Sequence, residues 1–356
     1  LSIRVKDNYW INLSVTGTAI RAILIASDGY VYVTGNFTAI NGVVCSHIAR
    51  INPWNAYLAN SNTISASDVS NMGGGLTATN GGYVLLEGPS GEILVGGDHS
   101  SAGGVSGTAQ LAYWTKDQVW TQLITGTGAG TGAVKALAFA SNGQERVRLY
   151  IGGDYTVLHN TTLASFSYVE YITVGPALTP VLAVAVTGGT ERIRSIAVVP
   201  ASNRIFVCGD FTSPVAFLGE YNGTTLLPIG APPDAYLTGL CIGSDGTLYL
   251  SGNYTSIGGI DANRVASYRN GQFFPLGEGF ASLAQACIPK GSGAAFLGDI
   301  ETVGELVRAR CGGVWTGTNW VQLPFMAQVP EDPILLAYAI NERLDVEAYF
   351  LSLIHI

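Results

Sequence analysis

The sequence predicts an all-β fold made of repeated four-stranded antiparallel units. Three observations lead to this prediction. Apolar residues make up 47% of the 356 residues and occur in short runs that Gly, Asn, Asp and Pro interrupt. Charged residues make up only 12%, against about 25% in an average globular domain. A strand-like run that ends in Gly followed by Asn or Asp recurs along the chain.

This composition excludes several classes of protein. A disordered chain needs low hydrophobicity and high charge, and a coiled coil is rich in charged helix formers. No apolar run approaches the roughly 18 residues that a membrane-spanning helix requires, so we expect no membrane insertion. The net charge is −8, with no basic run, so we expect no nucleic-acid partner.

The five cysteines predict neither a disulfide framework nor a zinc site. Their number is odd, they are widely spaced, and no Cys-x-x-Cys occurs. We interpret them as buried free thiols that act as small hydrophobes, and we expect no metal and no cofactor. They are Cys45, Cys208, Cys241, Cys287 and Cys311.

The recurring run carries a polar anchor at the same point of each unit, and successive anchors lie 43–62 residues apart. The anchors are Asn36, Asp98, Asp154, Asp210, Asn253 and Asp299. The clearest unit, residues 237–279, contains the turns Asp245-Gly246 and Asn270-Gly271, which are strong hairpin signals. Four strands in a repeat of this length are typical of a β-propeller blade.

We therefore predict a single β-propeller domain over residues 1–350, with about seven blades. Six are complete, at about 20–64, 82–125, 133–175, 193–230, 237–279 and 283–324. The seventh is split between the termini, because residues 335–350 supply its strands one and two and residues 1–13 its strands three and four. This pairing would close the ring and leave no exposed sheet edge.

Residues 351–356 are predicted to be a non-native tail. They read Leu-Ser-Leu-Ile-His-Ile, which resembles the translation of a transposon-end sequencing adaptor. On this interpretation the chain is a metagenomic fragment and part of a larger chain or assembly. The alternative is a genuine apolar strand.

The second unit has the pair Gly96-Gly97 after an apolar run, and then Tyr113 and Trp120. This pattern resembles the repeat of the kelch-like propeller family, which has an apolar run, a Gly-Gly pair, and then a Tyr followed by a Trp. One Gly is replaced elsewhere, as at Thr34-Gly35. The resemblance implies the propeller fold. Copper oxidases of the kelch type, similar to galactose oxidase, need two His and two Tyr ligands with a Cys cross-linked to one Tyr. No spacing here marks such a set.

The predicted topology places a binding site at one end of the ring. The loops between strands two and three (2–3) and between blades (4–1) emerge at what we call the anchor end. The 1–2 and 3–4 connections emerge at the opposite, turn end, and most are tight turns. The 2–3 loops, such as 39–46 and 99–108, are longer. Because rigid scaffolds carry binding residues on such loops, we expect the site at the anchor end.

The candidate binding residues are the anchors, one histidine and two tryptophans: Asn36, Asp98, His99, Asp154, Asp210, Asn253, Asp299, Trp54 and Trp114. The anchors could bind a cation or sugar hydroxyls, or accept backbone N–H bonds where each strand turns. Their recurrence in every blade favours the structural role. Exposed tryptophans would suit a glycan or protein partner, and the alternative is that they belong to the core between blades.

The sequence predicts a binding function. The nucleophile motif Gly-x-Ser-x-Gly is absent, and we assign no catalytic residue. We expect a non-catalytic binding or adhesion propeller of a surface, secreted or phage-virion protein, which recognises a glycan or protein through the anchor end. Its location would be extracellular, at a cell surface or on a virion. The alternatives are a kelch-like oxidase or carbohydrate-active enzyme on the same fold, and a structural spacer in a fibre or tail.

Overall fold

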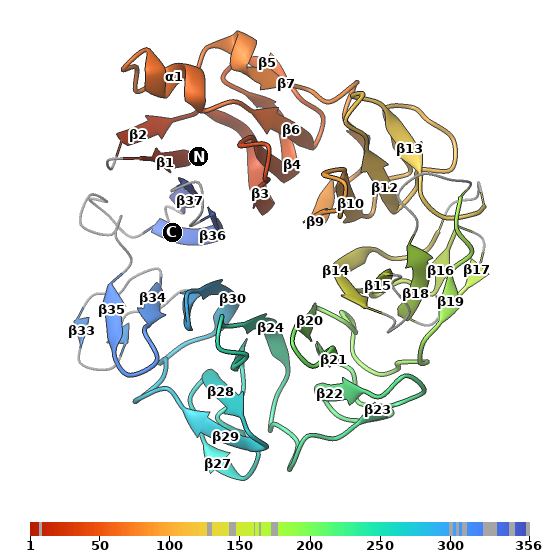
Figure 1. Cartoon of the computed structure of the whole chain (residues 1–356), viewed down its shortest axis with the longest axis vertical. Helices are drawn as coiled ribbons and strands as arrows, with labels where there is room; N and C mark the ends of the chain where they lie inside the picture. The colour runs from red at the N-terminus through yellow and green to blue at the C-terminus, as the bar shows by residue number, and fades with distance from the viewer. Residues whose placement is uncertain are drawn as a thin grey trace.

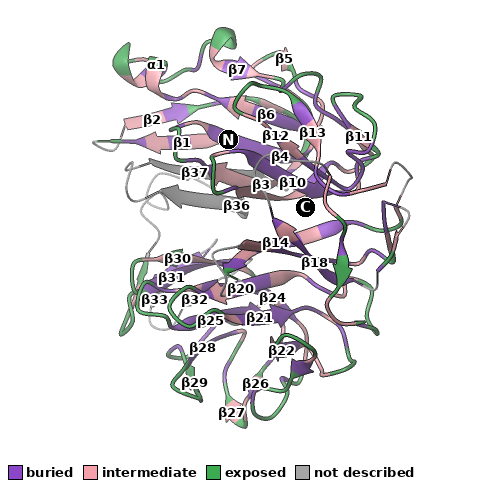
Figure 2. Cartoon of the chain, turned by 45° about the vertical axis from the view of Figure 1, so that its right-hand side comes forward, coloured by how far each residue is buried: buried purple, intermediate pink, exposed green. Residues whose placement is uncertain are grey.

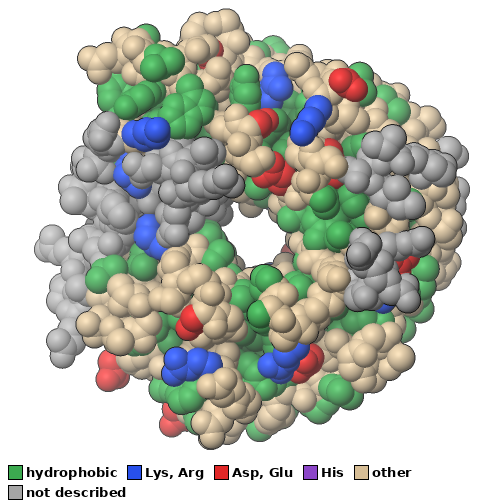
Figure 3. Space-filling view, in the orientation of Figure 1, with side chains coloured by type: hydrophobic (Ala, Val, Ile, Leu, Met, Phe, Trp, Pro, Cys, Tyr) green, Lys and Arg blue, Asp and Glu red, His purple; other side chains and the backbone are tan. Residues whose placement is uncertain are grey.

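Antiparallel sheets form a ring in a computed structural model of the chain (Figure 1), and the centre of the ring is open in the space-filling view (Figure 3). The predicted all-β propeller of four-stranded antiparallel blades is thus confirmed. The structure describes residues 1–6, 9–126, 130–141, 147–159, 161–163, 165–171, 177–298, 302–303, 306–307, 312–322, 333–341 and 346–353.

Six blades each consist of four strands in chain order, and the first strand of each lies nearest the centre (Figure 1). Blade one contains β3 (Val15–Ile25), β4 (Val31–Ile40), β6 (Ile48–Ile51) and β7 (Val69–Ser70), and blade two contains β9 (Gly82–Glu87), β10 (Ile93–Gly97), β12 (Leu111–Trp114) and β13 (Trp120–Gln122). Blade three contains β14 (Val134–Ser141), β15 (Val147–Gly153), β18 (Phe166–Tyr171) and β19 (Val181–Leu182), and blade four contains β20 (Ser195–Val199), β21 (Arg204–Cys208), β22 (Leu218–Tyr221) and β23 (Leu226–Leu227). Blade five contains β24 (Leu237–Ile242), β25 (Leu248–Gly252), β28 (Val265–Arg269) and β29 (Gln272–Pro275), and blade six contains β30 (Ala284–Lys290), β31 (Gly293–Gly298), β34 (Gly312–Trp315) and β35 (Trp320–Gln322).

Short strands also form in the loops of the anchor end. The two-stranded pairs are β5 (Val43–Val44) with the end of β4, β8 (Leu76–Thr77) with β11 (Ser101–Ala102), β16 (Val157–Leu158) with β17 (Thr161–Thr162), β26 (Ser256–Ile257) with β27 (Ile260–Asp261), and β32 (Thr302–Val303) with β33 (Leu306–Val307). Several 2–3 loops are therefore ordered hairpins rather than irregular connections.

The two ends of the chain pair in one further four-stranded sheet. Its order is β2 (Tyr9–Asn12), β1 (Ser2–Val5), β37 (Val346–Leu353) and β36 (Pro333–Asn341), and Arg4 lies opposite Glu347. That this sheet closes the ring as a split seventh blade stays a prediction, as does the non-native origin of the tail. Residues 351–353 continue β37, and 354–356 lie outside the described residues.

Two fourth strands lie further along the chain than predicted. In the first blade, β7 follows the expected end at residue 64, because helix α1 (Trp54–Leu58) and a 3-10 turn (Ala66–Asp68) precede it. In the third blade, β19 follows the expected end at residue 175. No hairpin signal marks either position, and the helix is too short to produce an amphipathic period.

The apolar core lies between neighbouring sheets. Each of six apolar clusters combines side chains of two sheets, and the second strands β10 and β25 are buried along their whole length (Figure 2). A Cβ on Gly96 would lie 2.5 Å from the Val134 Cγ1 of the next blade, so only glycine fits there. Blades that bury both faces against their neighbours explain the low charge of the chain. No helix among the described residues is long and apolar enough to cross a membrane.

Candidate functional site

Two of the predicted anchors tie the loops of the anchor end together. The Asp154 carboxylate accepts a hydrogen bond from the backbone N–H of Ala133 at 2.6 Å. The Asp210 carboxylate accepts from the N–H of Thr190 at 2.9 Å and of Glu191 at 3.1 Å. Each bond links the residue after strand two to the segment before strand one of the same blade. These carboxylates therefore hold loops, over a longer span than a local Asx turn.

The remaining predicted residues of this end vary in their surroundings. Asp98 accepts a 2.9 Å bond from the Asn80 side chain through Oδ2, while its Oδ1 is buried without a partner among the described residues. Asn36 and Asn253 are half-buried at the matching positions, and Asp299 lies outside the described residues. His99 is only 1% exposed, and burial lowers its pKa to about 4. A neutral, enclosed imidazole is poorly placed to contact a ligand.

A charged and aromatic band, which the sequence did not single out, crosses the anchor end from blade one to blade five. The Arg21 guanidinium lies 4.6 Å from the centre of the Tyr83 ring, and the Lys135 ammonium lies 5.3 Å from it. Lys135 also contacts Asp154 at 3.1 Å and Glu191 at 2.8 Å. Burial opposes the charge of Lys135, but the Glu191 and Asp154 carboxylates raise its pKa.

The band continues with Arg194, which pairs with Glu191 at 2.5 Å and lies 4.9 Å from the Tyr236 ring. Its members thus bind one another across blade boundaries. The signal in the sequence is a cation or tyrosine near the start of strand one in successive units. The arrangement stabilises the ring and leaves few charges unpaired for a ligand.

A cavity of about 720 Å³, the channel cavity, opens at the turn end of the ring centre. Its walls come from the first strands and 1–2 turns of blades four to six, with Leu86 of blade two also lining it. The apolar lining includes Ile196, Val198, Ile242 and Pro289. Ser244 and Asp245 add polar groups. These residues are distant in sequence and meet only because the blades form a ring.

A second cavity of about 290 Å³, the polar pocket, lies between blades one and two at the turn end. Asp28, Arg50, Glu87 and Lys116 line it, together with the predicted Trp114, which is 4% exposed. Acidic and basic side chains gather over β4 and β10 on the face that Figure 3 shows. Leu86 lines the channel cavity and Glu87 the polar pocket, so the two cavities are neighbours.

Trp54 is half-buried and is the first residue of α1, the helix at the outer edge of blade one in Figure 1. Its indole N–H donates to the carbonyl of Gly29 at 2.9 Å, and the Lys6 ammonium lies 5.8 Å from its ring. The structure therefore does not bring Trp54 and Trp114 together with the anchors: Trp114 lines the polar pocket at the turn end, and Trp54 bonds a 1–2 turn. No group of three or more His, Cys, Asp or Glu that could hold a metal occurs among the described residues.

Comparison with known proteins supports the fold. A family model described as a domain of unknown function (DUF5122) beta-propeller matches residues 26–55. No curated protein matches the chain. A virginiamycin B lyase from Staphylococcus aureus, solved with quinupristin, has a TM-score of 0.49 at 12% identity, over 96% of this chain and 99% of that one.

Two extracellular domains of B. thetaiotaomicron proteins are also similar. One, described as part of a hybrid two component system, has a TM-score of 0.57 at 10% identity over 94% of this chain. The other, described as part of a one component system, has a TM-score of 0.51 at 12% identity over 96% of this chain. The chain spans 38% of the length of each. At such identities the likeness shows the shared fold alone, and the chain is a β-propeller.

Proposed function

We propose that the chain is a non-catalytic binding propeller that takes its ligand at the turn end, where the channel cavity opens. The observation that carries the proposal is the cavity of about 720 Å³ whose walls are mainly apolar. Ligand sites in proteins are concave, mostly apolar and about 300–1,000 Å³ in volume, with a few polar groups that orient the ligand. The channel cavity meets each of these criteria.

This proposal moves the site away from the anchor end that the loop lengths favoured. There, Asp154 and Asp210 accept backbone N–H bonds, and Lys135 and Arg194 pair with Glu191. A ligand at the anchor end would have to replace the ion pairs of Lys135 and Arg194. At the turn end the apolar walls of the cavity are already accessible, so a ligand gains the burial of apolar surface without breaking them.

A protein partner is the ligand class that suits the channel cavity best. Ile196, Val198 and Ile242 offer apolar contact, which favours an aliphatic or aromatic side chain. A glycan hydroxyl buried there would lose hydrogen bonds to water, and this costs about 1–3 kcal/mol per group. Ser244 and Asp245 could hydrogen bond the backbone of a partner segment at the rim.

Nile red, a neutral dye that fluoresces in apolar surroundings, tests the cavity directly. We expect the purified chain to bind it saturably, and Ile242→Ser to weaken binding about tenfold, because a lost aliphatic contact is worth about 1.5 kcal/mol. Ile288→Ser is the matched control: Ile288 is also half-buried on a first strand, in the next blade, and is not part of the lining. An absence of binding, or equal affinity in both variants, would overturn the proposal.

Finer assignments also stand as proposals. Kinship with the kelch-like repeat is supported by Gly96-Gly97 on β10 and by Tyr113 and Trp120 on the third and fourth strands. We also propose, from the surface composition, that the protein is extracellular, at a cell surface or on a virion. On the same ground we propose that it comes from a phage or microbe and is part of a larger assembly. The uninterrupted gene would test them by showing any signal peptide and attached domains.

One observation favours the alternative of a carbohydrate-active enzyme. Asp28 and Glu87 line one pocket, and paired carboxylates are the machinery of glycoside hydrolysis. Release of reducing sugar from a panel of polysaccharides, lost in Glu87→Gln, would support it. We favour binding because both carboxylates accept hydrogen bonds from neighbouring groups of the chain.

A further inference from the structure

We propose that the polar pocket between blades one and two binds a single saccharide ring. The pocket has a volume of about 290 Å³. At roughly 30 Å³ for each water in the liquid, this is the space of about ten waters, the scale of one pyranose. The proposal is independent of the ligand proposed for the channel cavity, so either can fail alone.

The hydrogen-bond acceptors of the pocket are held in place by the chain. The Glu87 oxygens accept from the Ser27 N–H at 2.9 and 3.1 Å, and also from the Ser27 hydroxyl. The Asp28 oxygens accept from the Tyr30 N–H at 3.0 Å and the Tyr32 hydroxyl at 2.9 Å. Each carboxylate oxygen has two lone pairs, so both side chains can accept further bonds. Such fixed acceptors bind a ligand without first being ordered.

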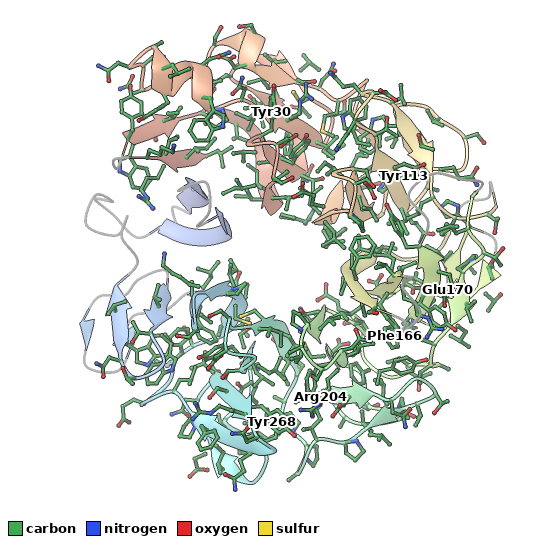
Figure 4. The ribbon with its side chains drawn as sticks, viewed as in Figure 1. Tyr30, Tyr113, Phe166, Glu170, Arg204 and Tyr268 are labelled. Atoms are coloured by element: carbon green, nitrogen blue, oxygen red, sulfur yellow. The ribbon has the colours of Figure 1, made fainter. Side chains whose placement is uncertain are left out.

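Arg50 supplies donors that two other arginines stacked on tyrosine rings, Arg148 and Arg204, do not. Arg148 and Arg204 each lie against a tyrosine ring and also pair with a glutamate, at 2.5 Å to Glu170 and 2.7 Å to Glu220. Figure 4 labels four of the compared residues, Glu170, Arg204, Tyr268 and Tyr30.

Arg50 lies 4.6 Å from the centre of the Tyr30 ring in the same way, but its hydrogen-bond partners are two neutral side chains, Gln118 at 3.3 Å and Tyr32. A guanidinium has five N–H donors, so several remain for a ligand.

Lys116 adds a second cation at the edge of the pocket. It lies in the 3–4 turn of blade two and is exposed. A Cβ on Gly91 would lie 2.9 Å from the Lys116 Cε, so glycine at this position leaves room for the lysine chain. Gly91 also has φ +81°, a conformation that glycine adopts readily.

The pattern of charge favours a neutral ligand rich in hydroxyls. Two carboxylates, Asp28 and Glu87, face two cations, Arg50 and Lys116, so an ion of either sign finds as much repulsion as attraction. A sugar hydroxyl donates one bond and accepts others, and it can therefore bridge acceptors and donors that lie side by side. Trp114 and Ile93 supply an apolar wall for the C–H face of the ring.

Saturation-transfer NMR with glucose, galactose, mannose, fucose and N-acetylglucosamine at millimolar concentration tests the proposal. We expect a saturable signal for at least one sugar. Arg50→Met, Glu87→Gln and Lys116→Met should each weaken its binding about tenfold, the effect of losing a charge-assisted hydrogen bond of roughly 1.5 kcal/mol. Lys116→Met is the variant least able to disturb folding, because the side chain is exposed.

Asp117→Asn is the matched control, since Asp117 lies in the same turn as Lys116 and is exposed but does not line the pocket. The affinity of this variant for the sugar should stay within twofold of that of the original chain. Ile242→Ser should also leave sugar binding unchanged. The proposal is overturned if no sugar binds, if binding persists at full strength in all three pocket variants, or if Ile242→Ser alone removes it.

Discussion

His99 should make the protein less stable as the pH is lowered. Its imidazole is 1% exposed. Burial disfavours the charged ring and lowers its pKa from 6.5 to about 4, although the Asp98 carboxylate acts in the opposite direction. The ring is therefore neutral in the folded protein at pH 7.

The magnitude follows from the protons that the folded and unfolded chains bind. Above pH 6.5 the ring is neutral in both states and adds no pH dependence. Between pH 6.5 and about 4 only the unfolded chain binds the proton, so each pH unit removes about 1.4 kcal/mol from the free energy of unfolding. The loss reaches about 3 kcal/mol and then levels off, which is a large share of the 5–15 kcal/mol typical of folded proteins.

Urea unfolding followed by tryptophan fluorescence, in unit steps from pH 8 to pH 4, measures this loss. The difference in unfolding free energy between the original chain and His99→Gln cancels the titration of the other groups. We expect this difference to be constant between pH 8 and pH 7. By pH 4 the original chain should have lost about 3 kcal/mol of unfolding free energy relative to the variant. A shift smaller than about 0.5 kcal/mol, the size of an ordinary surface effect, would show that His99 is not held neutral by burial.

Four further predictions address packing and ring closure. Lys135→Met should lower the unfolding free energy in urea by about 1–2 kcal/mol, because its side chain is 12% exposed and its ammonium joins two carboxylates; an unchanged midpoint would contradict this. Gly81→Ala should lower the unfolding free energy by about 2–3 kcal/mol, because the new Cβ would overlap a carbonyl oxygen of the neighbouring blade. Gly271→Ala is the control: Gly271 has a similar φ but open space around it, so this substitution should lower the unfolding free energy by only about 1 kcal/mol. Equal losses would argue against the packing described. Deletion of residues 1–13, which removes two strands of the terminal sheet, should lower the urea midpoint if that sheet is the split blade, and an unaltered midpoint would contradict the split blade. In a Cys311→Ser variant the remaining thiols, which are buried, should react with a thiol-reactive disulfide reagent only after the chain is unfolded. Rapid labelling of the folded chain would contradict this burial. The four thiols are Cys45, Cys208, Cys241 and Cys287.

The fold was predictable because its signals are local and repeated. Gly246 and Gly271 have φ +82° and +83°, and Asn270 has φ 52°, so the Asp-Gly and Asn-Gly pairs form the hairpin turns that the sequence indicated. The boundaries were less predictable where α1 (Trp54–Leu58) interrupts a blade, because no turn pair announces a strand as short as β7.

The candidate site was not predictable, because its residues meet only through the geometry of the ring. Asp28 and Glu87 come from different blades, and Ile242 faces a cavity that Leu86 lines from another blade. Loop length pointed to the anchor end, yet the cations there, Lys135 and Arg194, are paired with Glu191. Such partners lie on other strands, so a single strand read alone does not reveal whether its polar residue is free for a ligand.

A crystal structure of the chain soaked with small probe molecules, some apolar and some rich in hydroxyls, would show directly which end of the ring binds ligands. We expect apolar probes in the channel cavity beside Ile242 and hydroxylated probes in the polar pocket beside Glu87, both at the turn end. Probes that gather instead on the anchor end, around Asp98 or Asp210, and leave both cavities empty would contradict this expectation.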